Sequence, residues 1–282
     1  MKNHGFVAGL GTGLGGGHHG VYGSAELEEL GISRAEVRRR LRHGDLAVLR
    51  RGWYAAPGHD PVVAEAITNG GVLSCVSALK YYGFWVPPGY HRCHRRGPGG
   101  CRPYSRMPTG RHAVDSIVTA LECAARCMPD DDWIVVCDSV QNTMTVSAEA
   151  VRAEMGRLPG RVLTLFAKTD RDSQSGTETY VRLRLRALHY AVVVQPKIPG
   201  VGHTDLRIGR LIIECDSKEH HTGLADYQND RRRDRKATVG GYLTFRLTYA
   251  DVLYGWDEVL ADIRSITDAD RHRRRVGRKP SR

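Results

Sequence analysis

The chain has 282 residues, with 42 Lys and Arg against 31 Asp and Glu and a formal net charge of +11. This length is enough for two domains, and the positive charge favours polyanionic partners, with a basic protein that has no particular partner as the alternative. No apolar run is long enough to cross a bilayer, and the N-terminal residues lack the apolar core of a secretion signal. The seven cysteines are odd in number and irregularly spaced, which is typical of reduced thiols in a cytoplasmic protein.

Residues 1–23 are rich in Gly and His and show no periodic apolar pattern, which predicts a disordered leader. Ser24 then begins a helix that ends before Gly31, and Ser33 caps a second helix with Glu36 at the spacing of a capping box. Residues 46–54 predict a short basic hairpin. Helix, turn, basic helix and hairpin is the order of a winged helix-turn-helix, which we place at residues 24–60.

The arginines of this segment are candidates for contacts with DNA phosphates and bases, because a basic helix can enter a groove. They are Arg34, Arg38, Arg39, Arg42, Arg50 and Arg51. The alternative is a solvated basic helix. The run from Glu29 to Ala55, ELGISRAEVRRRLRHGDLAVLRRGWYA, is similar to the N-terminal winged helix of AbiEi-type antitoxins of type IV toxin-antitoxin systems. That resemblance implies promoter binding and autoregulation.

Residues 61–171 predict a mostly helical linker domain without a catalytic constellation. The expected helices are residues 62–68, 75–82, 114–128 and 147–157, with 133–138 as a strand or a helical core piece. His91, Cys93, His94 and Cys101 are the nearest approach to a metal-ligand cluster. Their spacing matches no common zinc template, so a loop is favoured over a zinc site there.

Three acids dominate the following segment, which we place at residues 172–268. A helix begins at Ser175 or Thr177 and carries Glu178 in its first turn. Asp205 stands on one expected strand, and Glu214 and Asp216 stand on the next, two residues apart and therefore on one face. Carboxylates on one face repel each other, and a divalent cation relieves that repulsion. Acids on a solvated strand end are the alternative.

Histidines and arginines follow the acids. His220 and His221 are candidates for an acid/base or water-positioning role near neutral pH, with two exposed loop histidines as the alternative. The next helix carries Arg231, Arg232 and Arg233, which are expected to neutralise phosphates. A Gly240-Gly241 break then leads into a closing strand, residues 242–247.

The order of motifs in this segment resembles the restriction-endonuclease-like PD-(D/E)XK superfamily, in the branch of the very-short-patch-repair endonuclease. The motifs that carry the resemblance are Asp205, Glu214-Cys215-Asp216, His220, Asp230–Asp234 and Gly241–Arg246. The resemblance covers residues 173–253. It implies a mixed sheet flanked by helices and a Mg²⁺ or Mn²⁺ ion bound by Asp205, Glu214 and the Cys215 carbonyl. It also implies His220 as the acid/base group, with His221 as the next choice, and makes Glu178 a candidate beside the metal, with a plain helix-capping acid as the alternative.

Two positions depart from the superfamily pattern. Asp216 stands where the superfamily usually has lysine, although aspartate is usual in this branch, and Lys218 and Lys236 are candidate substitutes. Ser217 stands where the branch prefers glycine.

The sequence therefore predicts an α/β (α+β) protein that binds DNA and hydrolyses phosphodiester bonds. The alternative is an AbiEi-like antitoxin or regulator with an inactive nuclease fold. An RNA-directed nuclease is disfavoured because aromatic stacking residues are scarce. DNA is the expected partner and no membrane is expected, while a second copy of the chain or a cognate toxin stays open. Residues 269–282 are expected to form a basic tail, either on DNA phosphates or simply solubilising.

Overall fold

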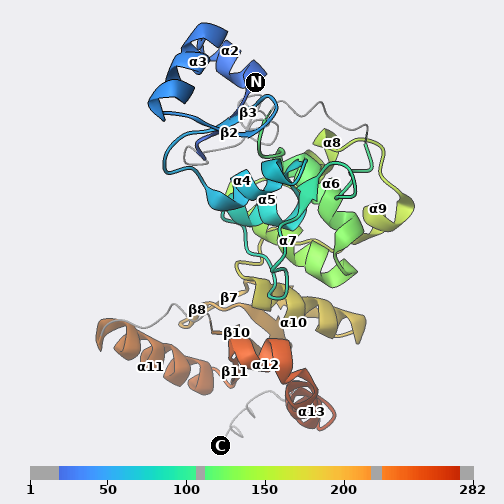
Figure 1. Ribbon diagram of the computed structural model, residues 1–282. Coiled ribbons are helices and arrows are strands. Elements are labelled where there is room, and N and C mark those ends of the chain that lie inside the picture. Colours follow the sequence, from blue (N-terminus) through green and yellow to red (C-terminus); the bar gives the residue numbers. More distant parts are fainter. Residues whose placement is uncertain (1–18, 106–111, 217–223, 274–282) are drawn as a thin grey trace, which may run out of the picture. The chain divides into compact units, whose positions relative to one another are not determined.

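The computed structural model describes residues 19–105, 112–216 and 224–273, and between 224 and 230 it describes a side chain only at Gln228. The chain divides into two compact units, an N-terminal unit of residues 1–169 and a C-terminal unit of residues 170–282. Both combine helices with small sheets, so the expected mixed α/β class is confirmed (Figure 1). Among the described helices, none has the length and apolar character of a membrane-spanning segment.

The N-terminal unit opens with a three-stranded antiparallel sheet and two helices. The strands are β1 (Val21–Gly23), β2 (Ala47–Arg50) and β3 (Trp53–Ala55), in the order β1-β3-β2. The helices are α2 (Ser24–Glu29) and α3 (Arg34–His43), and Leu27, Val37 and Leu46 form the core beneath them. β1 lies inside the predicted leader. That prediction was wrong at its C-terminal end, because Val21 pairs with Ala55 and is fully buried, while residues 1–18 lie outside the described residues.

Local signals at α3 act partly as expected. The Ser33 hydroxyl accepts a hydrogen bond from the Glu36 N–H at 3.2 Å, which caps the helix. The Glu36 carboxylate does not complete a capping box; it binds Arg39 and Arg40 at 2.7 and 2.8 Å. The N-terminus of α3 is therefore stabilised, and two of its arginines are held on the helix surface.

The rest of the N-terminal unit is helical, as expected. Its elements are α4 (Pro61–Thr68), β4 (Val72–Leu73), α5 (Cys75–Tyr81), β5 (Arg95–Arg96), α6 (Ile117–Cys127), α7 (Asp130–Met144), α8 (Ala148–Glu154) and α9 (Gly160–Phe166). Residues 133–138 are helical, within α7. Trp133 anchors this core, because its indole N–H donates to the Leu121 carbonyl at 2.9 Å and its ring packs edge-on against Phe166.

A buried ion pair joins β5 to the segment before α6. Arg96 and Asp115 form two hydrogen bonds, at 2.7 and 2.6 Å, and their side chains are only 7 % and 5 % exposed. Burial of two charges is tolerated because each satisfies the other in a bidentate geometry. The pair thus fixes the loop that follows α5 to the start of α6.

The C-terminal unit is a four-stranded mixed sheet with helices. Its elements are α10 (Gly176–Ala187), β6 (Val192–Val194), β7 (Lys197–Ile198), β8 (Gly202–His203), β9 (Leu206–Ile208), β10 (Leu211–Cys215), α11 (Leu224–Val239), β11 (Leu243–Leu247), α12 (Tyr249–Tyr254) and α13 (Trp256–Thr267). The order is β11-β10-β9-β6, with β6, β9 and β10 antiparallel and β11 parallel to β10. A parallel pair needs a long crossover, and α11 supplies it.

Residues after α13 return to the sheet. The His272 carbonyl accepts the Arg210 N–H at 2.8 Å, and His272 is 7 % exposed. Gly209 has φ +57°, and a Cβ there would lie 2.7 Å from the His272 oxygen, so only glycine fits this contact. The predicted tail at 269–282 therefore begins too early; residues 274–282 lie outside the described residues.

Candidate functional site

Asp205 and Glu214 lie side by side at the ends of neighbouring strands. Leu206 pairs with Ile213, so the next two residues, Asp205 and Glu214, stand opposite each other on one face. The Asp205 N–H donates to Glu214 Oε2 at 3.3 Å, and Asp205 Oδ2 accepts the Cys215 N–H at 2.7 Å. The backbone of β9 and β10 thus holds both carboxylates at one end of the sheet.

Glu178 reaches the same place from the first turn of α10. Ser175 caps this helix by accepting the Glu178 N–H at 3.1 Å. Glu178 Oε2 accepts the Gln195 side-chain N–H at 3.0 Å, and the same nitrogen lies 3.5 Å from Asp205 Oδ1. Gln195 also donates its main-chain N–H to the Asp205 carbonyl at 2.8 Å, and its φ is +46°. One amide therefore joins the helix acid to the strand acid.

Burial perturbs all three carboxyls. Desolvation and then the charge of Asp205 raise the pKa of Glu178 to about 7. Desolvation likewise raises the pKa of Asp205. For Glu214, desolvation and then the charge of Asp205 raise the pKa to about 7. Buried acids that repel one another are a donor set of hard oxygens, which fits a divalent cation such as Mg²⁺. Gln195 links Glu178 to Asp205, and a main-chain hydrogen bond links Asp205 to Glu214. Because Mg²⁺ sites commonly use only one or two carboxylates, an ion here does not need all three.

Arg233 lies against these acids. Its guanidinium is 3.2 Å from Glu214 Oε1, and it also donates to the carbonyls of Val201 and His203 at 3.1 and 2.5 Å. Arg231 and Arg232 are exposed on α11, and Arg231 is 4.0 Å from Asp234. Of the three arginines on α11 that are predicted to contact phosphates, Arg233 thus already binds the Glu214 carboxylate and two main-chain carbonyls.

Asp216 lies toward β11 and shares the Arg246 guanidinium with Asp234. Arg246 is 3.7 Å from Asp216 and 2.9 Å from Asp234, and it pairs with Glu214 in the parallel register. A row of Gln195, Asp205, Glu214 and Arg246 therefore crosses the four strands. Asp216 is about half exposed, and its charge helps to raise the pKa of Asp205.

Other predicted residues of this region lie outside the described residues. They are Lys218, His220 and His221. Sequence reasoning missed Gln195 and Arg246 as members of the site. Gln195 directly follows β6, ten residues before Asp205, and its contacts with Glu178 and Asp205 depend on the fold.

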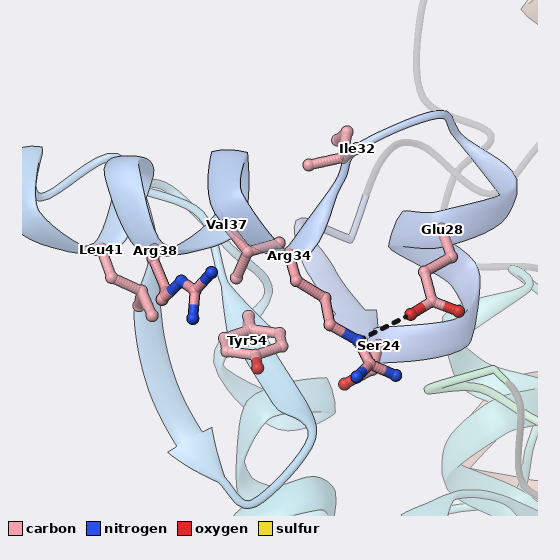
Figure 2. Close-up of a pocket in the computed structure, with 8 residues that line it drawn as sticks. All are labelled: Ser24, Glu28, Ile32, Arg34, Val37, Arg38, Leu41 and Tyr54. Atoms are coloured by element: carbon pink, nitrogen blue, oxygen red, sulfur yellow. Dashed lines mark hydrogen bonds and ion pairs between the residues drawn. The ribbon is translucent and has the colours of Figure 1, made fainter.

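The arginines of the N-terminal unit differ in how far they are engaged, and Figure 2 shows two of them, Arg34 and Arg38. Arg34 pairs with Glu28 at 3.3 Å, and Arg39 is held by two 2.7 Å bonds to Glu36. Arg50 stacks over Trp53 and donates to the Gly71 carbonyl, so it is partly structural. Arg38, Arg42 and Arg51 are exposed. A hollow of about 300 Å³ lies beside α3 and is lined by Ser24, Glu28, Ile32, Arg34, Val37, Arg38, Leu41 and Tyr54.

The raised carboxyl pKa values predict a pH-dependent stability of the metal-free protein. Glu178 and Glu214 have an ordinary pKa of 4.5 and a folded pKa of about 7, so the folded state binds more protons between these values. Stability is therefore fully present below about pH 4.5 and is lost as the pH rises through about 7, by roughly 1–3 kcal/mol. We expect Mg²⁺ to raise Tm more at about pH 8 than at about pH 5.5, because ionised carboxylates bind it.

Thermal unfolding at both pH values, with and without Mg²⁺, measures this effect. Glu214→Gln is expected to flatten the pH dependence, whereas Glu258→Gln, an exposed acid on α13, is expected to leave it unchanged. Equal Tm gains from Mg²⁺ at both pH values would contradict the prediction.

The chain was compared with models of known protein families, with curated proteins and with solved structures, and nothing in any of the three matched it.

Proposed function

We propose that the chain is a metal-dependent DNA endonuclease whose site is the acid group of the C-terminal unit. The observation that carries the proposal is the pairing of Asp205 with Glu214 through the main chain of two neighbouring strands, at 3.3 and 2.7 Å. A four-stranded mixed sheet with a helix before it and a helix in its parallel crossover supports the restriction-endonuclease-like fold that the sequence resembles.

In this proposal, Asp205, Glu214 and the Cys215 carbonyl hold Mg²⁺ or Mn²⁺. Such an ion polarises a phosphoryl oxygen and lowers the pKa of a bound water. The Cys215 N–H fixes Asp205 Oδ2 at 2.7 Å, and Oδ1, which lies 3.5 Å from the Gln195 side-chain nitrogen, is the oxygen proposed to bind the ion. The Gln195 side-chain N–H donates to Glu178 at 3.0 Å and holds it beside Asp205. Glu178 can therefore hold a proton close to the reacting phosphate. His220, with His221 and Lys218, completes the proposal as the acid/base and charge-supplying group.

The N-terminal unit is proposed to place the protein on DNA as a winged helix. Two helices and a three-stranded sheet support this, because α3 ends in a cluster of basic residues and leads directly into the hairpin. The exposed Arg38, Arg42 and Arg51 are the strongest candidates for phosphate contacts. Arg39 is a weaker candidate because Glu36 already binds it.

A second function is supported by one observation. Glu214 already has a counter-charge, since Arg233 lies 3.2 Å from it and is anchored to two backbone carbonyls. An arginine fixed in this position favours a DNA-binding regulator or antitoxin whose nuclease fold does not cut. Both functions predict DNA affinity that falls with salt, so binding alone does not separate them.

Cleavage of supercoiled plasmid separates the two. We expect the wild-type chain to nick it with Mg²⁺ or Mn²⁺ and not with EDTA, and Asp205→Ala to lose the nicking. A wild-type protein that shifts DNA fragments yet never cuts with any of these metals would support the regulator instead.

A further inference from the structure

Four ligand-bearing side chains from separate segments of the N-terminal unit meet at one point. Cys75 is the first residue of α5, His94 directly precedes β5, Cys101 follows the turn after β5, and Cys127 is the last residue of α6. Their ligand atoms all lie within 4.8 Å of one another. Cys101 Sγ is 3.6 Å from His94 Nδ1 and 3.6 Å from Cys127 Sγ. Among the described residues, this is the only such group.

These separations match the edges of a tetrahedral metal site. With a Zn–S bond of about 2.3 Å and a Zn–N bond of about 2.0 Å, a regular tetrahedron places sulfurs about 3.8 Å apart and sulfur and nitrogen about 3.5 Å apart. A disulfide instead needs about 2.05 Å between sulfurs, and all seven cysteines are free thiols. Three soft sulfurs and one imidazole are the ligands that zinc prefers. We propose that Cys75, His94, Cys101 and Cys127 bind one zinc ion.

The backbone is shaped to bring these four residues together. The Ser74 N–H donates to the His94 carbonyl at 3.0 Å, and the His94 N–H donates to the Ser77 hydroxyl at 2.8 Å, so His94 is fastened to α5 from both sides. The Cys101 N–H donates to the Arg95 carbonyl at 2.8 Å. A Cβ on Gly100 would lie 2.3 Å from that carbonyl oxygen, so the turn that returns Cys101 to His94 requires glycine.

Cys75 itself is held in a strained conformation. Its φ of +54° lies in the left-handed region that a residue with a side chain rarely adopts, and its side chain is fully buried. The buried Cys75 thiol lies beside two other thiols and an imidazole. Metal ligation can hold such a strained backbone conformation in place.

The site is structural, because four protein ligands leave no open position for a substrate. Between α5 and α6 the described chain contains only the two-residue strand β5 as regular structure, and this loop is tied to its surroundings by the Arg96–Asp115 pair and by the backbone bonds of His94. Zinc would bind the loop to the start of α5 and the end of α6 at once. Cys75 is buried, His94 and Cys101 are half-buried and Cys127 is exposed, so the metal is reached from the Cys127 side.

The test uses the full chain, purified under reducing conditions. We expect one zinc per chain by elemental analysis, and after replacement by Co²⁺ we expect the sulfur-to-cobalt charge-transfer band and the visible bands of a tetrahedral thiolate site. Cys101→Ser and Cys127→Ser are each expected to weaken zinc binding about 100-fold or more. Cys93→Ser is the matched control, since Cys93 neighbours His94 but lies outside the group, and it is expected to keep full affinity.

Several outcomes would overturn the proposal. They are a wild-type chain that binds no zinc after reconstitution, a Cys101–Cys127 disulfide in the reduced preparation, and undiminished binding in both ligand variants. Should the serine variants fail to fold, the cobalt spectrum of the wild type still decides. Asp205→Ala is expected to retain the zinc, which separates this site from the acid group of the C-terminal unit.

Discussion

Asp205→Asn is expected to slow strand cleavage about 10³-fold, equivalent to roughly 4 kcal/mol of lost transition-state stabilisation. Asparagine keeps an oxygen that can accept the Cys215 N–H, now made at 2.7 Å, so the end of the sheet keeps its shape. It removes the charge that would hold the divalent cation. Glu214→Gln is expected to act similarly while it retains an acceptor for the Asp205 N–H. Rates of plasmid nicking under single-turnover conditions measure both effects.

The fold and the DNA affinity are expected to survive these two changes. Tm in the absence of metal should be unchanged or higher at about pH 8, because one buried like charge is removed. Glu258→Gln, at an exposed position of α13, is the matched control and is expected to cut at the wild-type rate. Cutting by Asp205→Asn at more than about a tenth of the wild-type rate would exclude Asp205 as a metal ligand.

Asp115→Ala is expected to destabilise the N-terminal unit by about 3–5 kcal/mol. The change leaves the Arg96 guanidinium, whose side chain is 7 % exposed, without the carboxylate that it binds at 2.6 and 2.7 Å. An uncompensated buried charge is far more costly than the loss of the pair itself. Urea unfolding, followed by tryptophan fluorescence, measures the effect, since Trp53, Trp85 and Trp133 all belong to this unit.

A surface pair supplies the control. Arg34 and Glu28 lie 3.3 Å apart, with side chains 88 % and 53 % exposed, so Glu28→Ala is expected to cost less than about 1 kcal/mol. Replacing both members of the buried pair by apolar residues of similar size is expected to restore most of the stability. If Asp115→Ala and Glu28→Ala unfold at the same urea concentration, the buried pair does not hold this loop.

Local signals predicted much of the fold. Ser33 and Ser175 cap α3 and α10 as expected, because an N-cap depends on residues three apart in the chain. The turn at Arg51 and Gly52 was correctly placed in a hairpin. Glu214 lies on β10 as expected, whereas Asp216, expected on the same strand, lies one residue beyond its end at Cys215.

What the sequence did not predict depends on distant contacts. β1 was not predicted within the glycine-rich segment, because the strand with which it pairs, β3, comes some thirty residues later. Cys75 and Cys127 were not joined to His94 and Cys101, since they come from the ends of two helices that only tertiary packing brings together. His91 and Cys93, considered with His94 and Cys101, lie outside the group. Chain proximity therefore joined two of the four residues that the fold brings together, although their spacing favoured a loop over a metal site.

The four-residue row that crosses the sheet has a consequence for how this half of the protein can change over time. Each member occupies its place only while its strand keeps its alignment with the next, since sliding one strand by a single residue turns its side chains to the opposite surface. Insertions or deletions within β9 or β10 would thus separate Asp205 from Glu214, even if every residue type were retained.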